Sequence, residues 1–232
     1  MQPPSSAAGA GATLAQVAAE VAACRTCPRL VDWREQVAAE KVARYRQWDY
    51  WGRGVPGFGD PDAHLVIIGL APAAHGANRT GRVFTGDRSG DFLYAALHRN
   101  GYANQPTSTH ADDGLRLTGA YVTAAVKCAP PANKPTPVER EACRPFLRRE
   151  LAMLASARVL LALGRFGWDV VCSTFGARPR PVFAHGAEVA LPGDLTLLAS
   201  YHVSQQNTFT GTLTEAMLDD VLRRARAVGA AP

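Results

Sequence analysis

Short, continuous apolar runs alternate with longer segments of helical periodicity along this chain. The apolar runs lie at 65–70, 120–126, 159–163 and 195–201. A short run without polar interruption is typical of a strand that is buried on both faces of a parallel sheet. Apolar residues recur three or four positions apart in the other segments, which predicts helices over 14–23, 29–46, 90–100, 138–155, 166–175 and 214–227. The alternation predicts an α/β fold with three layers, α/β/α, around a central four-stranded parallel sheet.

Residues that break regular structure mark the remaining segments. Glycine, proline and aromatic residues fill 48–60 and prolines fill 128–137, so both segments are expected to be irregular. Pro137 opens the next helix, at a position where a proline is well tolerated. A polar loop is expected over 103–114 and a short hairpin-like stretch over 180–191. We predict one domain over 12–232, preceded by a disordered tail at 1–11 that is rich in Ala, Pro, Ser and Gly.

The composition is that of a soluble protein able to bind a polyanion. Hydrophobic residues make up 47% of the 232 residues, which is enough for a packed core. No apolar run approaches the roughly 18 residues that a membrane-spanning helix needs, so we expect no membrane partner. The formal net charge is +5, and most of the positive charge comes from arginine, which suits bidentate phosphate contact. We expect a cytoplasmic protein, associated with the nucleoid.

Candidate chemistry follows two of the predicted strands. The segment from Gly69 to Asp87 begins with small residues, which allow a flat ligand to approach the backbone at the carboxyl end of a strand. Within it, Phe84 offers a stacking face and Asp87 a carboxylate. The alternative is an ordinary strand-to-helix loop. His202 ends the last strand and is followed by a polar loop; its alternative role is a hydrogen-bonded core histidine. Because both strand ends belong to one predicted sheet, a ligand site is favoured.

These two segments carry a resemblance to a known family. G-L-A-P-A-A-H-G-A-N-R-T-G-R-V-F-T-G-D at 69–87 and H-V-S-Q-Q-N at 202–207 resemble the two signature motifs of the family 5 (type B) uracil-DNA glycosylases. The resemblance extends from about Cys24 to the last helix. It implies an enzyme of DNA repair that flips uracil out of double-stranded DNA and hydrolyses its N-glycosidic bond, leaving an abasic site. Ala71 stands where sister families carry a polar residue, which favours type B over type A (family 4).

Four of the five cysteines occur as two pairs. Cys24 and Cys27 form a Cys-x-x-Cys pair, and Cys128 and Cys143 follow about a hundred residues later. Four thiolates in two pairs predict a metal or cluster site, and the ligand count alone does not separate zinc from a [4Fe-4S] cluster. The resemblance implies a [4Fe-4S] cluster, for which we expect a structural role. Cys172 lies in an apolar helical pattern and is expected in the core.

Each candidate site residue has an expected role. His202 would donate a hydrogen bond to a carbonyl oxygen of the leaving base, helped by backbone N–H groups of the loop that includes Leu70, Ala71 and Ala73. Phe84, flanked by Gly86, would stack on the base. Asp87 would position water or stabilise the cationic sugar, or it would cap the following helix; both roles are compatible.

A bland pocket is expected to accept several bases. Ala124 stands where sister families place a base-reading asparagine, so a candidate for contact with the base or the water is Asn133, which would otherwise be a turn residue. Fewer polar readers imply activity on some damaged or deaminated bases as well as uracil. The resemblance implies that these bases include hypoxanthine, hydroxymethyluracil and ethenocytosine.

Polar and basic residues of the two motif segments and of the proline-rich segment are candidates for contact with DNA. Four residues, Ser204, Gln205, Gln206 and Asn207, would enter the minor groove, and three cations, Arg79, Arg82 and Lys134, would contact phosphates. A monomer is expected. The rival readings are a type A enzyme with a narrower range, a non-catalytic zinc-containing DNA-binding module and an electron-transfer protein, whose cluster cysteines would lie closer together in sequence.

Overall fold

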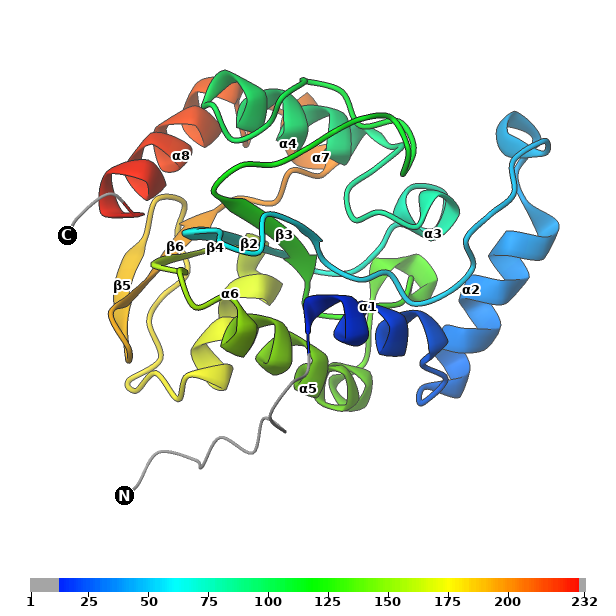
Figure 1. Ribbon diagram of the computed structural model, residues 1–232, viewed down its shortest axis with the longest axis horizontal. Helices are drawn as coiled ribbons and strands as arrows, with labels where there is room; N and C mark the ends of the chain where they lie inside the picture. The colour runs from blue at the N-terminus through cyan, green and yellow to red at the C-terminus, as the bar shows by residue number, and fades with distance from the viewer. Residues whose placement is uncertain (1–12, 230–232) are drawn as a thin grey trace.

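A six-stranded sheet forms the middle layer of the computed structural model, which describes residues 13–229 (Figure 1). The strand order is β1-β3-β2-β4-β6-β5. The four central strands are parallel, as predicted: β2 (Leu65–Gly69), β3 (Ala120–Ala124), β4 (Val159–Leu163) and β6 (Leu195–Ser200). Two antiparallel edge strands extend this core, namely β1 (Phe58–Gly59) beside β3 and β5 (Glu188–Leu191) beside β6.

Helices cover both faces of the sheet. Figure 1 shows α4 and α8 on one face, α1, α5 and α6 on the other, and α2 and α3 at one end. Their bounds are α1 Leu14–Ala23, α2 Pro28–Glu40, α3 Ala77–Thr80, α4 Arg88–Arg99, α5 Pro137–Met153, α6 Gly164–Thr174, α7 Gln205–Phe209 and α8 Glu215–Gly229, with 3₁₀ turns at Ala43–Tyr45 and Pro131–Asn133. The predicted three-layer α/β/α architecture is confirmed.

Alternate residues of the buried strands pack into two separate hydrophobic cores, one on each face of the sheet. On β2, Leu65 and Ile67 pack with residues of α4 and α8, whereas Val66 and Ile68 pack with residues of α5 and α6. All four are fully buried, as expected of a central parallel strand. Cys172 is also buried in the second core, which confirms its predicted place.

Element ends differ from the prediction where the backbone departs from ordinary geometry. The helix predicted over 29–46 ends at Glu40, because Lys41 adopts a positive φ of 53° that stops the helix. Pro137 does open α5, where Thr136 and Glu139 form a reciprocal capping box. The expected tail at 1–11 lies outside the described residues. No described helix has the length and apolar character to cross a membrane.

A buried ion pair fixes the chain where it leaves β3. Lys127 Nζ lies 2.6 Å from Glu150 Oε2, and both side chains are almost inaccessible. Glu150 also accepts hydrogen bonds from the Thr123 hydroxyl and the Gly57 backbone N–H. Loss of either charged partner would leave an uncompensated charge in the core, so the pair specifies how this segment is held.

Candidate active site

The two predicted motif loops meet at the carboxyl edge of the sheet. The first follows β2 and the second follows β6, with β4 between them in the strand order. The Phe84 and His202 rings bring the two loops together, with centroids 6.2 Å apart. Gly164, directly after β4, leaves room for this approach, since a Cβ there would lie 3.0 Å from that of His202. The site therefore forms where open α/β sheets bind ligands.

Phe84 is held in a conformation that ordinary side chains avoid. Its φ is +50°, in the left-handed region. The edge of the ring lies close to the backbone of β2, where a Cβ on Gly69 would come within 2.6 Å of it. A hydrogen bond from the buried Tyr94 hydroxyl to the Val83 carbonyl holds the preceding residue. Strain of this kind persists only where surrounding contacts impose it, and here they hold an aromatic wall in place.

His202 is an uncharged hydrogen-bonding group at neutral pH. Desolvation lowers the pKa of its imidazole to about 4. Its backbone carbonyl accepts a hydrogen bond of 2.8 Å from the Asn207 side chain, which ties the strand end to α7. The neutral ring keeps one N–H donor, and this donor is what an oxygen gaining negative charge requires.

The partly buried, desolvated imidazole of His202 makes stability depend on pH. The pKa of His202 is about 4 when folded and about 6.5 when unfolded, so the unfolded chain binds the extra proton as the pH falls. We expect His202 to cost about 1–2 kcal/mol of unfolding free energy between pH 8 and pH 5. Urea unfolding of the wild type and His202→Gln at both pH values measures this. An equal loss in both proteins would contradict it.

Asp87 both caps a helix and remains available for chemistry. Its Oδ1 accepts a hydrogen bond of 3.0 Å from the Gly90 N–H, which makes it the N-cap of α4. Desolvation raises the pKa of the carboxyl. Its Oδ2 lies directly above Gly76, where an added Cβ would come within 1.9 Å of it. Gly76 thus makes the space for this carboxylate, a role that only the folded geometry shows.

The first motif loop offers unused backbone donors. The Leu70 carbonyl accepts a hydrogen bond from the Val126 N–H, which ties the start of the loop to the end of β3. Within residues 13–229, the N–H groups of Ala71, Ala73 and Ala74 have no hydrogen-bond acceptor. All three alanines are partly exposed. Unpaired N–H groups beside a stacking ring and a neutral histidine can stabilise developing negative charge.

Two of the three expected phosphate contacts are corrected by the structure. Arg79 and Arg82 are 3% and 4% exposed and are used inside the protein. Arg79 donates 2.8 Å hydrogen bonds to the His75 and Gly86 carbonyls, and Arg82 pairs with Asp113 at 2.7 Å. A buried charge needs such partners, so these arginines shape the loop around the site and cannot reach a DNA phosphate.

The third expected cation lies beside Asn133 on a strained turn. Both Asn133 and Lys134 are exposed. Ala132 and Asn133 have successive positive φ values of 51° and 55°. A hydrogen bond of 3.1 Å from Arg29 to the Lys134 carbonyl holds the turn. No hydrogen bond joins the Asn133 side chain to Asp87 or His202 in the described part of the chain, so its predicted role stays a prediction.

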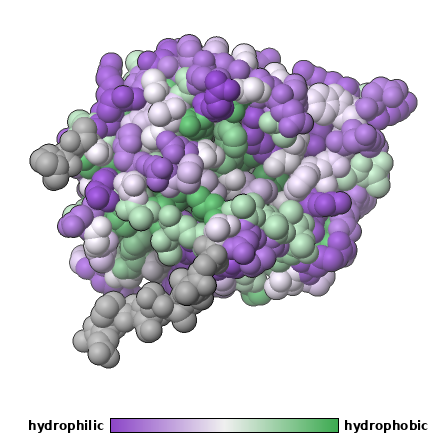
Figure 2. All heavy atoms as spheres, in the orientation of Figure 1, coloured by the Kyte–Doolittle hydropathy of each residue, from purple (hydrophilic) through white to green (hydrophobic). Residues whose placement is uncertain are grey.

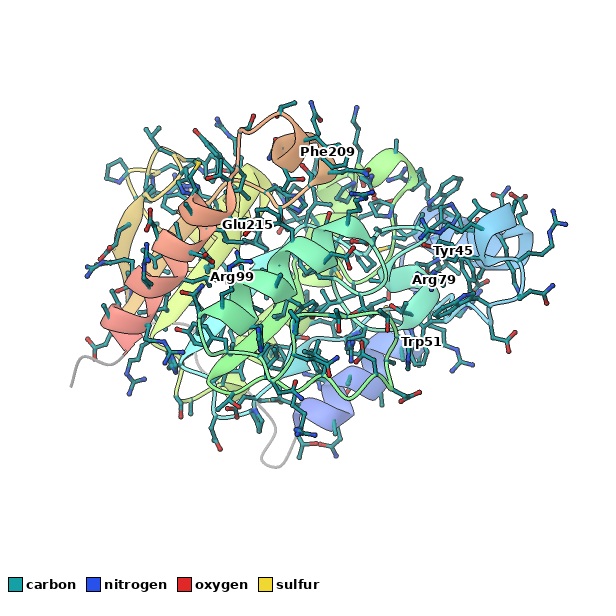
Figure 3. The ribbon with its side chains drawn as sticks, turned by 90° about the horizontal axis from the view of Figure 1, so that it is seen from above. Tyr45, Trp51, Arg79, Arg99, Phe209 and Glu215 are labelled. Carbon is teal, nitrogen blue, oxygen red and sulfur yellow. The ribbon has the colours of Figure 1, made fainter. Side chains whose placement is uncertain are left out.

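The second motif loop is a short helix with an exposed aromatic residue at its end. Ser204 is the N-cap of α7, and Gln205 and Gln206 are exposed on its first turn. Phe209, which the sequence analysis did not single out, lies at the end of α7 and is 66% exposed (Figure 3). The centroid of its ring is 5.3 Å from the Arg88 guanidinium. Its position seven residues after His202 was the available signal. Arg88 follows Asp87, so this contact is a second link between the motif loops.

The four paired cysteines line one cavity. Cys24 and Cys27 come from the turn between α1 and α2, and Cys128 and Cys143 come from the loop after β3 and from α5. The remaining lining is mostly apolar, without histidine or acidic side chains. The buried Arg34 donates to Cys128 Sγ at 2.9 Å, and the Lys127 N–H donates to Cys143 Sγ at 3.2 Å.

The donor set of this cavity consists of thiols, which both zinc and iron–sulfur clusters accept as ligands. All five cysteines are free of disulfides. Within residues 13–229, no three or more His, Cys, Asp or Glu side chains are arranged to hold one metal ion. Iron–sulfur clusters take four thiolates as ligands, and hydrogen bonds to those sulfurs are part of how proteins hold them. The residues present therefore fit a four-thiolate cluster.

Comparison with known proteins identifies the family. The sequence model of the uracil DNA glycosylase superfamily matches residues 56–226, which is most of the chain, and the protein belongs to this superfamily. A type-5 uracil-DNA glycosylase of Mycobacterium tuberculosis is 52% identical over 222 residues, covering 94% of this chain and 83% of that protein. One of Thermus thermophilus is 55% identical over 205 residues, covering 88% and 93%. The chain is a member of the type-5 family.

The type-4 relatives are more distant. A type-4 uracil-DNA glycosylase of Pyrobaculum aerophilum is 32% identical over 130 residues, covering 56% of this chain and 58% of that protein. The resemblance inferred from the motifs at 69–87 and 202–207 is thus confirmed at the level of the family.

Proposed function

We propose that this protein removes uracil from double-stranded DNA by hydrolysing the bond between the base and the sugar, and that it leaves an abasic site. The observation that carries the proposal is the meeting of Phe84 and His202 from two distant loops at one sheet edge. An aromatic wall facing a neutral hydrogen-bond donor suits a flat ring with a carbonyl oxygen. Such a base must be turned out of the duplex to reach it. The enzyme works as a monomer on the DNA of the nucleoid.

The base side of the reaction needs stabilisation of a leaving anion. As the C1′–N bond breaks, its electron pair moves into the base and onto a carbonyl oxygen. The His202 N–H and the unpaired N–H groups of Ala71 and Ala73 supply donors for that oxygen. Preorganised donors of this kind are among the largest contributions to catalysis. The departing base then takes a proton from solvent.

The sugar side needs a nucleophile and a negative charge. Breaking the C1′–N bond leaves a cationic, oxocarbenium-like sugar, and a carboxylate stabilises such a charge. Asp87 is the carboxylate of the motif loop, and its Oδ2 is not engaged in capping. It orients a water molecule whose oxygen bonds to C1′. As the bond to C1′ forms, the water loses one proton to the Asp87 carboxylate, which passes it to solvent and so balances the proton that the base takes up. Asn133 is the second candidate to hold this water.

We infer further that the four paired cysteines bind a [4Fe-4S] cluster. The ligands would be Cys24, Cys27, Cys128 and Cys143, which line one cavity. The cluster would supply four strong bonds that fasten the α1–α2 turn to the end of β3 and to α5. Its contribution is to the fold, and the chemistry at C1′ belongs to the motif loops.

Small residues at the base-reading positions support a broad substrate range. Ala71 and Ala124 offer no side-chain hydrogen bond to a base edge. A pocket without specific polar partners rejects analogues weakly. We expect release of hypoxanthine, hydroxymethyluracil and ethenocytosine as well as uracil, at rates within about 100-fold of one another. Measuring single-turnover release from four duplexes of one sequence tests this, and release confined to uracil would contradict it.

Base release from a labelled duplex with one uracil tests the function itself. The wild type should convert the uracil strand to an alkali-labile abasic strand and leave an undamaged duplex intact. His202→Gln should slow release by about 100- to 1,000-fold, the usual loss for one oxyanion donor. Lack of release by folded, iron-loaded wild type from any of the duplexes would overturn the proposal in favour of a DNA-binding module.

A further inference from the structure

The segment 41–53, which we call the basic arm, projects from one end of the molecule. It follows α2, and its outermost part is the 3₁₀ turn at Ala43–Tyr45 (Figure 1). It carries four cations, Lys41, Arg44, Arg46 and Arg53, and one acid, Asp49. In Figure 2, which has the same orientation, this end is coloured mainly hydrophilic. The arm therefore holds a large part of the chain's net charge of +5 on one protrusion.

The cations of the arm differ from most arginines of the surface in their partners. Elsewhere, Arg25, Arg29, Arg149 and Arg224 are each paired with a glutamate. Across the described residues, no acidic side chain lies within 4.0 Å of the cations of the arm. Arg44 and Arg53 instead lie over the rings of Tyr45 and Trp51, at 5.1 and 5.6 Å. Their charges remain free for an external anion.

The arm is fastened to the first motif loop by a buried arginine. The Arg79 guanidinium contacts two nearly perpendicular rings of the arm, 3.8 Å from the centroid of Tyr45 and 4.1 Å from that of Trp48. The Trp51 backbone N–H donates to the Arg79 carbonyl at 3.0 Å. Tyr45, Arg79 and Trp51 lie together at one end of the molecule in Figure 3. A desolvated cation against two aromatic rings is a strong contact, so the arm has a defined position against the first motif loop.

A hollow with a volume of about 400 Å³ lies at the base of the arm. Its lining includes Arg25 and Glu35, which form an ion pair with each other, and the exposed Arg53 of the arm. Arg34 also lines it, but this side chain is 1% exposed and donates to Cys128 Sγ and to the Cys24 carbonyl. Arg53 is therefore the cation that this hollow presents to an external anion.

We propose that the basic arm and the hollow at its base bind the phosphodiester backbone of the DNA beside the extruded nucleotide. The inference rests on the proposed function, because that function supplies the DNA. It also accounts for the burial of Arg79 and Arg82: they position the loop and the arm, while the cations of the arm contact the phosphates. Phosphate contacts of this kind set affinity and orientation without reading sequence.

The salt dependence of DNA binding tests the arm. We would measure binding of a short fluorescein-labelled duplex that carries an uncleavable abasic-site analogue, by anisotropy, from about 50 to about 200 mM salt. The triple variant Lys41→Ser, Arg44→Ser, Arg46→Ser should lower the slope of log K against log[salt] by about 2–3 units in magnitude. Its affinity at about 100 mM salt should weaken about 10-fold or more. Arg53→Ser should lower the slope by about one further unit.

A second triple variant provides a matched control. Arg116→Ser, Arg148→Ser, Arg178→Ser removes the same charge from exposed positions outside the arm. It should bind with nearly the wild-type slope. The charge-conserving pair Arg44→Lys, Arg46→Lys should keep the slope as well, which separates loss of charge from damage to the arm.

The outcomes separate the two proposals. If the arm variant binds like the wild type, or weakens no more than the control variant, the inference is overturned even though the wild type releases uracil. If the wild type releases no uracil from a cleavable duplex, the proposed function fails, whatever the binding slopes show.

Discussion

Asp87→Asn is expected to slow uracil release by about 100- to 10,000-fold while leaving the fold intact. Asparagine caps helices as well as aspartate does, so the hydrogen bond to the Gly90 N–H and the start of α4 are preserved. The negative charge that would stabilise the sugar and orient water is lost. Single-turnover release, measured with enzyme in excess over a uracil duplex, reports the chemical step directly.

Two further variants sharpen this prediction. Asp87→Ala should be as slow as Asp87→Asn and should also lose about 1 kcal/mol of stability, because it removes the cap. Gly76→Ala, which places a Cβ against the Asp87 carboxylate, should slow release without altering any titratable group. If Asp87→Asn releases uracil at the wild-type rate, water activation lies elsewhere, and Asn133→Ala is the next variant to measure.

If the four paired cysteines hold the proposed cluster, Cys143→Ala is expected to abolish cluster binding and to lower the stability of the protein severely. Cys143 is 9% exposed and lines the cavity with the other three paired cysteines. Losing one ligand from a four-thiolate site leaves three thiolates around an incompletely held metal, and metal-binding energy of this kind is also folding energy. Iron and sulfide analysis, the visible absorption spectrum and thermal unfolding measure the effect in the purified protein.

The fifth cysteine supplies the control for that experiment. Cys172 lies on α6 and is buried in a different core. Cys172→Ala should therefore keep the iron content and the visible absorption spectrum of the wild type. One zinc ion per chain in the wild type, or an unchanged iron content in Cys143→Ala, would contradict the cluster proposal.

The sheet was predictable because its strands are buried on both faces. The run at 159–163 has no polar residue, and β4 has the predicted bounds. The edge strand β5 lies within the hairpin-like stretch predicted over 180–191, whereas the edge strand β1 was not predicted. β1 has only two residues in a segment rich in Gly and Pro, and it pairs because β3 offers a free edge. Strand pairing of so short a segment depends on tertiary contacts that no local pattern records.

The sequence predicts which residue types form the candidate site, but it does not predict which of these side chains are buried or what they contact. Phe84 and His202 could be named from their motifs, and the structure brings their rings together. Arg79 and Arg82 have the same residue type as a phosphate contact, yet both are buried. Sequence alone does not show that Arg79 packs against Tyr45 and Trp48, which lie more than thirty residues away in the chain.

The contact of Arg79 with Tyr45 and Trp48 has a consequence for chimeras in which segments are exchanged between this protein and its relatives. The segments 45–52 and 69–87 are separate in the chain, but Arg79 joins them by its contacts with two rings and by a backbone hydrogen bond. A chimera that takes only the second segment from this protein would bury a guanidinium without its aromatic partners. A chimera that takes only the first segment would leave the Tyr45 and Trp48 rings without the guanidinium that they contact. Exchanges that respect this pairing should yield folded hybrids, and breakpoints between the two segments should be poorly tolerated.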